Sequence, residues 1–157
     1  MDSRAFRNAM GCFATGVTVI TTEVEEETHG MTANAFMSVS LEPKLITVSI
    51  DNRANMLTKI YQSEKFAVNV LADTQQDISM HFANQAKKYE EVPFDILKGV
   101  PIIQDALVSV VCEVDRAFEV GDHTLFIGKV EAIHSNNGNP LTFYKGQYGK
   151  YEPAEYV

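Results

Sequence analysis

Three short segments of the 157-residue chain carry side chains that could do chemistry. The first spans residues 30–40, where small, hydroxyl-bearing and amide-bearing residues interrupt an otherwise aliphatic sequence. Small side chains let a flat ligand approach the backbone, whose N–H groups can then donate hydrogen bonds to ring carbonyls and nitrogens. A mildly polar edge strand explains the same composition more simply, so this segment alone does not define a site.

The other two segments are a turn and a stretch near the C-terminus. Gly121, Asp122 and His123 stand at the expected junction of two strands, and residues 144–150 combine glycines, aromatic residues and lysines. Each has a purely local explanation. Glycine and aspartate are common in turns, a lone histidine after a turn is usually a surface residue, and the third segment could be a basic, flexible tail.

The familiar catalytic motifs are missing from the sequence. It contains no G-x-G-x-x-G, no G-x-x-x-x-G-K-[ST] and no G-x-S-x-G, so a Rossmann nicotinamide site has no anchor. None of the four histidines stands at metal-ligand spacing from another histidine or from a cysteine, so we expect no metal site.

Composition limits the classes of protein to consider. The net charge is −8 at pH 7, with 13 Lys and Arg against 21 Asp and Glu, which argues against nucleic acid as the main partner. No apolar run approaches the roughly 20 residues of a membrane span, and the N-terminus lacks the apolar core of a signal peptide. Cys12 and Cys112 form no C-x-x-C pair, so we expect free thiols in a reducing cytoplasm, with Cys112 buried.

The elements that must position these segments are mostly short strands. Alternating and β-branched residues predict strands over 13–22, 31–40, 44–51, 65–71, 107–120, 124–133 and 141–148. Short helices are predicted over 3–10, 52–62 and 74–83, with Ser3 and Thr74 as N-caps, and a long surface excursion over 84–101. Because turns rather than long helices join six or seven strands, we expect one mainly β domain over 1–157, an antiparallel barrel or sandwich with a tail from 152.

From about residue 6 to 151 the chain resembles the flavin reductase family, the small reductase components of two-component flavin monooxygenases such as 4-hydroxyphenylacetate and phenol hydroxylases. The matching landmarks, in order, are F-A-T-G-V-T-V at 13–19, G-M-T-A-N-A-F at 30–36, S-V-S-L-E-P at 38–43, H-F-A at 81–83, G-D-H at 121–123 and P-L-T-F-Y at 140–144. The resemblance implies an antiparallel, Greek-key split β-barrel that binds flavin and works as a homodimer. It also implies FMN or FAD as the flavin and NADH or NADPH as the reductant.

The resemblance also implies roles for particular residues. Those expected to line the flavin are Thr32, Ala33, Asn34, Ala35, Ser38, Val39 and Ser40, together with His81, Phe82 and Ala83. Those expected near the ribityl phosphate are Ser49, Asn52, Arg53 and Asn55. The G-D-H turn, Gly121, Asp122 and His123, is expected to meet the nicotinamide through His123, and Tyr148 completes the cofactor-binding set.

The chemistry expected from this resemblance is hydride transfer from nicotinamide to flavin, for which the protein need only stack and tune the two rings. Arg53 would pair with the phosphate, and the local cations Arg53, Lys87, Lys88 and Lys145 would attract an anionic cofactor to an acidic protein. Reduced flavin would pass to a partner oxygenase or another acceptor. Two alternatives stay open, namely an FMN-binding electron-transfer protein reduced by a protein donor, and a non-catalytic module that binds another planar cofactor.

Overall fold

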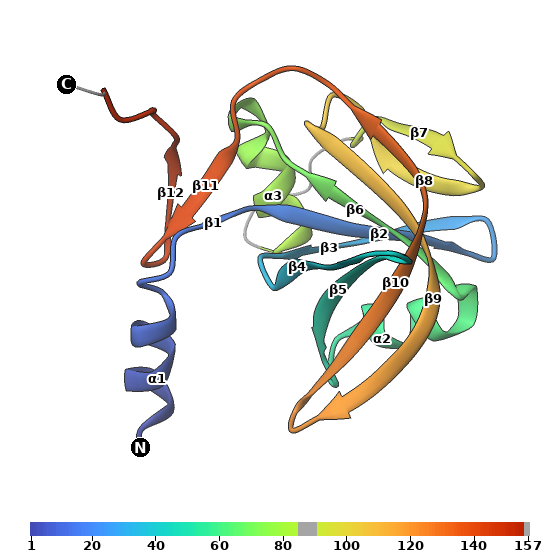
Figure 1. Ribbon diagram of the computed structural model, residues 1–157, viewed down its shortest axis with the longest axis horizontal. Helices are drawn as coiled ribbons and strands as arrows, with labels where there is room; N and C mark the ends of the chain where they lie inside the picture. Colours follow the sequence, from blue (N-terminus) through green and yellow to red (C-terminus); the bar gives the residue numbers. More distant parts are fainter. Residues whose placement is uncertain (85–90, 156–157) are drawn as a thin grey trace.

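The protein is built around one curved antiparallel sheet of seven strands (Figure 1). A computed structural model describes residues 1–84 and 91–155. Neighbours across the sheet follow the order β3, β2, β6, β9, β10, β5, β4, and each pair is antiparallel. The strands are β2 Thr18–Val24, β3 Glu27–Ala33, β4 Phe36–Leu41, β5 Lys44–Asp51, β6 Lys65–Val70, β9 Val108–Val120 and β10 His123–Ser135.

The two edge strands of this sheet, β3 and β4, follow one another in the chain and are joined only by Asn34 and Ala35. Both edges therefore meet at this short connection, which carries the amide side chain of Asn34. The expected mainly β, antiparallel fold class is confirmed. Among the strands described, β3 and β4 are not a hydrogen-bonded pair, so closure into a split barrel and its Greek-key detail stay predictions.

Smaller elements complete the fold. β1 (Thr15–Gly16) pairs with β11 (Leu141–Tyr144), which pairs with β12 (Gln147–Lys150). β7 (Phe94–Leu97) and β8 (Val100–Ile103) form a separate hairpin. The helices are α1 Ser3–Met10, α2 Asn55–Ser63 and α3 Gln76–Phe82, the last preceded by a 3₁₀ turn over Asp73–Gln75. No helix of the described residues is long and apolar enough to cross a membrane.

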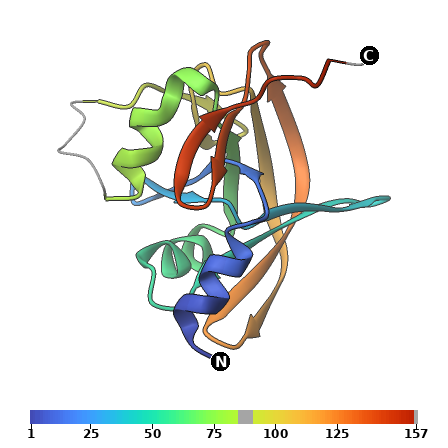
Figure 2. The same ribbon diagram turned by 90° about the vertical axis from the view of Figure 1, so that its left-hand side faces the viewer.

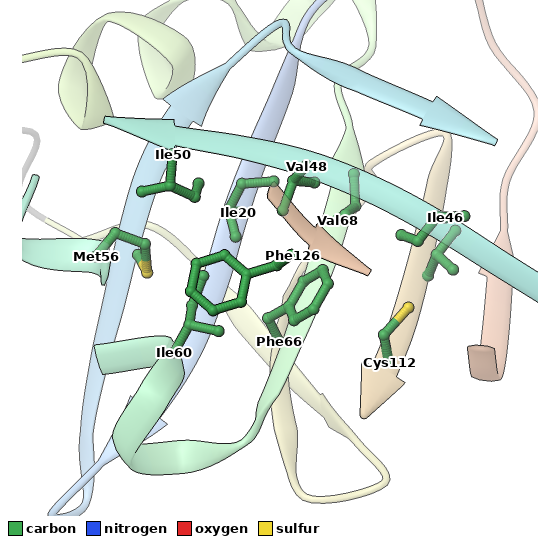
Figure 3. Close-up of a cluster of buried hydrophobic side chains, with 11 residues drawn as sticks. Ile20, Ile46, Val48, Ile50, Met56, Ile60, Phe66, Val68, Cys112 and Phe126 are labelled. Atoms are coloured by element: carbon green, nitrogen blue, oxygen red, sulfur yellow. The ribbon is translucent and has the colours of Figure 1, made fainter. Parts of the chain in front are cut away.

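The main core lies between the sheet and α2 (Figure 3). Phe66 and Phe126 are completely buried and are the largest side chains in it. Ile60 of α2 packs in the same cluster, so this helix is held to the sheet by apolar contact. Burial of each such side chain stabilises the fold by about 1.5–3 kcal/mol. As expected from the alternation in β9, Cys112 is buried as well, and burial raises the pKa of its thiol to about 12.

A buried amide ties four strands together. Asn69 of β6 donates from Nδ2 to the Val19 carbonyl at 3.0 Å and to Thr21 Oγ1 at 2.9 Å, both in β2. Its Oδ1 accepts from the Ile103 N–H of β8 at 3.0 Å and from Ser109 Oγ of β9 at 2.8 Å. Nδ2 and Oδ1 of Asn69 thus make two hydrogen bonds each inside the protein. The bond from Ile103 fixes the β7–β8 hairpin on the sheet.

Helix α1 stands away from the sheet, at the end of the molecule that also holds β1, β11 and β12 (Figures 1 and 2). None of its residues is buried, and Phe6 and Met10 are both more than half exposed. Its expected span, 3–10, is confirmed, but the N-cap is Asp2 rather than Ser3, since Asp2 Oδ1 accepts from the Arg4 N–H at 3.2 Å.

Three further expectations about elements are wrong. Residues 94–103 are not surface excursion but the β7–β8 hairpin, and all four residues of β8 are buried. The last strand is two strands, β11 and β12, joined by a turn at Lys145 and Gly146 whose φ angles are both positive. Thr74 lies inside the 3₁₀ turn and caps no helix. Lys87 and Lys88 lie outside the described residues.

Candidate functional site

A cavity of about 1310 Å³ lies between α1 with the segment that follows it, the β3–β4 connection, β5 and the β11–β12 turn. It exceeds the roughly 300–1,000 Å³ of a typical small-molecule pocket. Its lining is mostly apolar, with a few hydroxyl and amide groups, which is the usual character of a cofactor site.

One wall of the cavity is made of small and amide-bearing residues. Asn34 and Ala35 line it from the β3–β4 connection, Thr15 and Gly16 from β1, and Ser49 from β5. The Ser49 N–H donates to the Ala35 carbonyl at 3.1 Å, and Asn34 Nδ2 lies 3.4 Å from Thr15 Oγ1. A Cβ added at Gly16 would meet nothing within 4 Å, so the backbone there faces open space. This wall therefore lets a flat ligand lie against main chain.

Two other residues expected at the flavin support this wall rather than line it. Thr32 Oγ1 donates to the Ser79 carbonyl at 2.6 Å, which ties β3 to α3. The Ala33 carbonyl accepts from Thr18 Oγ1 at 2.6 Å, which fixes the end of β3 against β2. Neither Thr32 nor Ala33 belongs to the cavity lining.

The S-V-S stretch falls on β4, beyond the cavity. Val39 sits at an irregularity in the pairing of β4 with β5, between Ser38 and Ser40. Ser38 and Val39 are exposed and Ser40 is half-buried, and none of the three lines the cavity of this single chain. The expected strand over 31–40 is wrong as a single element, because Asn34 and Ala35 divide it into β3 and β4. The expected contact of these three residues with flavin stays a prediction.

The charges around the cavity are unlike those of the chain as a whole. Its lining includes Arg7 of α1 and Lys145 of the β11–β12 turn, and no aspartate or glutamate. A hydrogen bond with Tyr144 raises the pKa of Lys145, and the Lys145 ammonium lies over the ring of Tyr144, 5.3 Å from its centre. Lys145 is one of the local cations expected from the sequence, whereas Arg7 is not. No local pattern in the sequence distinguishes Arg7 from the other charged residue of α1.

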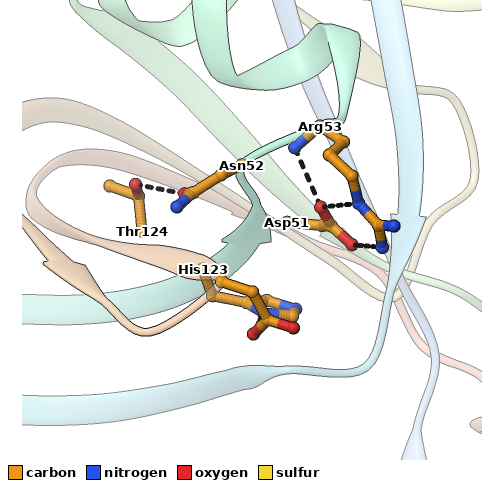
Figure 4. A network of polar contacts seen from close by, with 6 residues as sticks. Asp51, Asn52, Arg53, His123 and Thr124 are labelled. Atoms are coloured by element: carbon orange, nitrogen blue, oxygen red, sulfur yellow. Dashed lines mark hydrogen bonds and ion pairs between the residues drawn. The ribbon is translucent and has the colours of Figure 1, made fainter.

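A second polar cluster lies where β5 ends and β10 begins (Figure 4). Arg53 donates from Nε and Nη2 to the two carboxylate oxygens of Asp51, at 3.0 and 2.7 Å. These hydrogen bonds hold the pKa of Asp51 well below its usual range. Thr124 Oγ1 donates to Asn52 Oδ1 at 2.8 Å, which joins the two strand ends.

The G-D-H turn belongs to this second cluster. Gly121 adopts a φ of 63°, a conformation that glycine takes without steric cost, and it turns the chain from β9 into β10. His123 Nδ1 lies 2.7 Å from Asp122 Oδ1, and this hydrogen bond lowers the pKa of Asp122. His123 also stands directly opposite Asp51 in the β5–β10 pairing. Its ring is therefore oriented by one carboxylate and close to another.

The residues expected near the phosphate do not all lie together. Ser49 lines the cavity, whereas Asn52 and Arg53 belong to the second cluster and Asn55 is the first residue of α2. The guanidinium of Arg53 is occupied by Asp51 and lies outside the cavity lining. Asp51 takes only Nε and Nη2 of this exposed guanidinium, so the expected pairing of Arg53 with a phosphate stays a prediction.

The H-F-A segment forms a third group, on α3 and its C-terminus. The rings of His81 and Phe82 are 4.7 Å apart, edge to face, and Ala83 caps the helix. Ser79 of the same helix shares a 2.8 Å hydrogen bond with the Tyr148 hydroxyl of β12. Tyr148 therefore positions α3. None of these residues belongs to the lining of the large cavity, so their contact with a cofactor stays a prediction.

Within the described parts of the chain, no group of three or more His, Cys, Asp or Glu side chains is arranged to hold a metal ion. The features together define a class of protein: an antiparallel β protein with a large cavity, bordered by small residues and by cations. The chain belongs to the family described as flavin reductase like domain, which matches residues 10–152.

Individual relatives agree with this assignment and confirm the resemblance drawn from the motifs. An NADH-dependent flavin reductase from Rhodococcus sp is 46% identical over 149 residues, covering 93% of this chain and 85% of that protein. The reductase component of 4-hydroxyphenylacetate 3-monooxygenase from Thermus thermophilus is 35% identical, covering 92% and 93%. The solved structure of the flavin reductase PheA2 in its native state is 55% identical, with a TM-score of 0.95, covering 98% of this chain and 100% of that one.

Proposed function

We propose that this protein is an NAD(P)H-dependent flavin reductase, an oxidoreductase that transfers a hydride from the nicotinamide to FMN or FAD. The observation that carries the proposal is the cavity whose wall is built by the T-A-N-A segment and β1, in a chain of the flavin reductase family. The relative from Rhodococcus sp uses NADH and acts on flavin.

The residues of the cavity fit a flavin. Ala35 and Gly16 present little or no side chain, so a flat ring can lie against the backbone beside them. Asn34 and Ser49 supply an amide and a hydroxyl for ring or ribityl oxygens. The volume, about 1310 Å³, leaves space for a second ring system next to the first.

Bound flavin and nicotinamide would supply the electron chemistry themselves. The task of the chain is to hold two rings face to face and to exclude water from between them. Backbone N–H groups at the β3–β4 connection would stabilise negative charge that develops on a flavin ring at that wall. Apolar lining residues such as Leu125 and Val70 would keep the space dry.

For the nicotinamide we keep the proposal that His123 orients it. The 2.7 Å contact with Asp122 fixes the ring of His123 at the end of β10, and Gly121 lets the chain turn tightly beside it. Leu125, two residues further along the same strand, lines the large cavity. Residues two apart on a strand share a face, so His123 stands on the cavity side of β10.

We further propose that the protein is a homodimer and hands reduced flavin to an oxygenase component. Phe13, Met37 and Leu41 are large apolar residues that are 80%, 59% and 84% exposed, and Phe13 and Met37 border the cavity. A second copy that covers them would also narrow the cavity mouth. The oxygenase partner is proposed from the Thermus thermophilus relative, which is itself a monooxygenase reductase component.

Both cysteines are free thiols, which supports the proposal of a reducing, cytoplasmic location.

The experiment is to follow NADH and NADPH oxidation by the purified protein with FMN, FAD or no added flavin. We expect flavin-dependent loss of the reduced nicotinamide absorbance with at least one of the four combinations. No turnover in any of them would refute the proposed activity. Light scattering on the same preparation would give the mass, and a monomer at micromolar concentration would contradict the proposed dimer.

A further inference from the structure

Asn52 is bonded to the residues on both sides of His123 (Figure 4). Its backbone N–H donates to the Asp122 carbonyl at 3.0 Å, and its side-chain Oδ1 accepts from Thr124 Oγ1 at 2.8 Å. Asp122 and Thr124 directly precede and follow His123 in the chain. A single residue at the end of β5 therefore holds the G-D-H turn before and after its histidine.

The place of Asn52 follows from the pairing of the two strands. Thr124 stands opposite Ile50 and His123 opposite Asp51, so β5 and β10 are paired up to the start of the turn. The hydrogen bond from Asn52 to Asp122 lies just beyond this last pair and extends the pairing by one residue. The turn that links β9 to β10 is thereby also attached to β5.

The two side chains that matter most lie on opposite faces of β10. Successive residues of a strand alternate between its faces, so Thr124 shares a face with Phe126, and His123 lies on the other. Thr124 and Phe126 are buried, whereas the side chain of His123 is 41% exposed. The Thr124–Asn52 hydrogen bond therefore has its donor in the protein interior, where such a bond is stronger than in water, while the imidazole faces outward.

The hydrogen bond between His123 and Asp122 cannot fix the imidazole by itself. It joins Nδ1 to Oδ1 over 2.7 Å, but the side chain of Asp122 is 87% exposed and sits in a turn next to Gly121. A carboxylate on a turn holds its partner in place only if the main chain of the turn is held too. The two bonds of Asn52 supply that second restraint.

We infer that Asn52 and Thr124 position His123 for the nicotinamide. This inference rests on the proposed function and deepens it, because Asn52 acts through the histidine and not on the reacting rings. Both partners of the Asn52–Thr124 hydrogen bond are positioning residues in this sense. Direct contact of Asn52 with the flavin is the competing explanation, and the test separates the two.

Thr124→Val removes the hydroxyl and keeps the shape of the side chain, and Asn52→Ala removes its acceptor. We expect each to raise the KM for NADH about three- to fivefold at saturating FMN, since one hydrogen bond of this kind is worth about that factor. The dissociation constant of FMN, measured by flavin fluorescence, should change less than about twofold in both. Thr124→Ser keeps the hydroxyl and should stay within about twofold of the wild-type KM.

The same substitutions in a His123→Ala background show whether they act through the histidine. With the imidazole absent, Thr124→Val and Asn52→Ala should change the KM for NADH less than about 1.5-fold, because nothing is left for them to orient. A full effect in this background would mean that the pair acts on the ligand or on the fold directly, and would overturn the inference.

Thr22→Val is the matched control for the loss of a buried threonine hydroxyl. Thr22 Oγ1 lies 2.7 Å from both Ser63 Oγ and the Lys65 carbonyl, and Thr22 belongs neither to the cavity lining nor to the G-D-H turn. We expect this variant to lose stability in urea unfolding as Thr124→Val does, yet to keep the KM for NADH within about 1.5-fold. An equal rise in KM would trace the effect to stability alone and refute the positioning role.

The remaining outcomes also decide. A loss of FMN affinity in Asn52→Ala at an unchanged KM for NADH would assign Asn52 to the flavin and overturn the inference. An unchanged KM in His123→Ala would remove the proposed role of His123, and this inference with it, while NADH oxidation by the wild type still supported the proposed activity. A wild-type protein that oxidises neither NADH nor NADPH would refute the proposed function itself.

Discussion

The ring of Phe82 on α3 lies so close to Gly30 in β3 that a Cβ on residue 30 would stand 2.4 Å from its Cε1 atom. Glycine at this position is therefore required by the approach of a side chain and not by the backbone. The contact, the Thr32–Ser79 hydrogen bond and the Ser79–Tyr148 hydrogen bond together set the position of α3 on the sheet.

Gly30→Ala should test this contact. The methyl group would push the Phe82 ring out of place, and overpacking of this kind costs about 1–3 kcal/mol in the free energy of unfolding. In a Phe82→Ala background the same substitution should cost less than about 0.5 kcal/mol, because the clash is gone. Urea unfolding of the four proteins measures both values. Equal costs in the two backgrounds would mean that Phe82 is not the obstacle.

His123→Ala should affect use of the nicotinamide more than binding of the flavin. We expect the KM for NADH to rise about tenfold while the dissociation constant of FMN changes less than about twofold, because the loss of one contact to a substrate is of that size. Asp122→Asn keeps the imidazole but weakens the hydrogen bond that orients it, and should give a smaller rise. A collapse of FMN affinity with an unchanged KM for NADH would show that His123 serves the flavin.

Asn69→Ala should destabilise the protein severely. It leaves the Ile103 N–H, the Ser109 hydroxyl and the Val19 carbonyl without their buried partner, which costs roughly 2–4 kcal/mol in the free energy of unfolding. Thr58→Ala is the matched control, since the hydroxyl of Thr58 makes an exposed hydrogen bond to the Asn55 carbonyl. The Thr58→Ala substitution should lower the free energy of unfolding by less than about 0.5 kcal/mol. Comparable losses of unfolding free energy in the two variants would show that the buried hydrogen bonds of Asn69 stabilise the protein no more than one exposed hydrogen bond.

The buried thiol of Cys112 should make stability fall at alkaline pH. Its pKa is raised from 9.0 to about 12 in the folded protein, so above pH 9 the unfolded chain releases this proton and the folded one keeps it. The contribution of the Cys112 thiol to the free energy of unfolding is therefore complete below pH 9. It is lost as the pH rises toward 12, by at most about 1.4 kcal/mol per pH unit.

Cys112→Ala lacks this thiol and isolates its effect from that of other groups. Urea unfolding of wild type and variant at two pH values, about 8 and about 10, should show a steeper decline for the wild type. Parallel declines would mean that the thiol ionises equally well in the folded protein.

The sequence predicted most strands because their signal is local. The alternation around Cys112 and the β-branched run in β2 confirm this, as does the span of α1. The β7–β8 hairpin escaped prediction because Pro93, Gly99 and Pro101 are typical of a loop. What makes it a hairpin is its burial against β6 and β9 and the bond from Ile103 to Asn69, which are contacts between distant parts of the chain.

Local sequence patterns likewise predict only part of the candidate site. The T-A-N-A segment could be singled out by its composition, and Asn34 and Ala35 do line the cavity. Arg7 could not be singled out in this way, because an arginine on an exposed helix has no distinguishing sequence pattern. The position of Arg7 at the cavity depends on the hydrogen bond from the Lys145 N–H to the Gly11 carbonyl. No local sequence pattern indicates that these two distant segments will meet.

The pairing of β1 with β11 has a consequence for the order of assembly during translation. All seven strands of the large sheet precede residue 136, while the hairpin that holds the N-terminal segment in place comes after it. The large sheet can therefore pair all its strands before β1 has a partner, while one side of the cavity is still open. Residues 11–16 can reach their final position only after the β11–β12 hairpin has formed beside them, so this segment is ordered by a part of the chain that lies far away in the sequence.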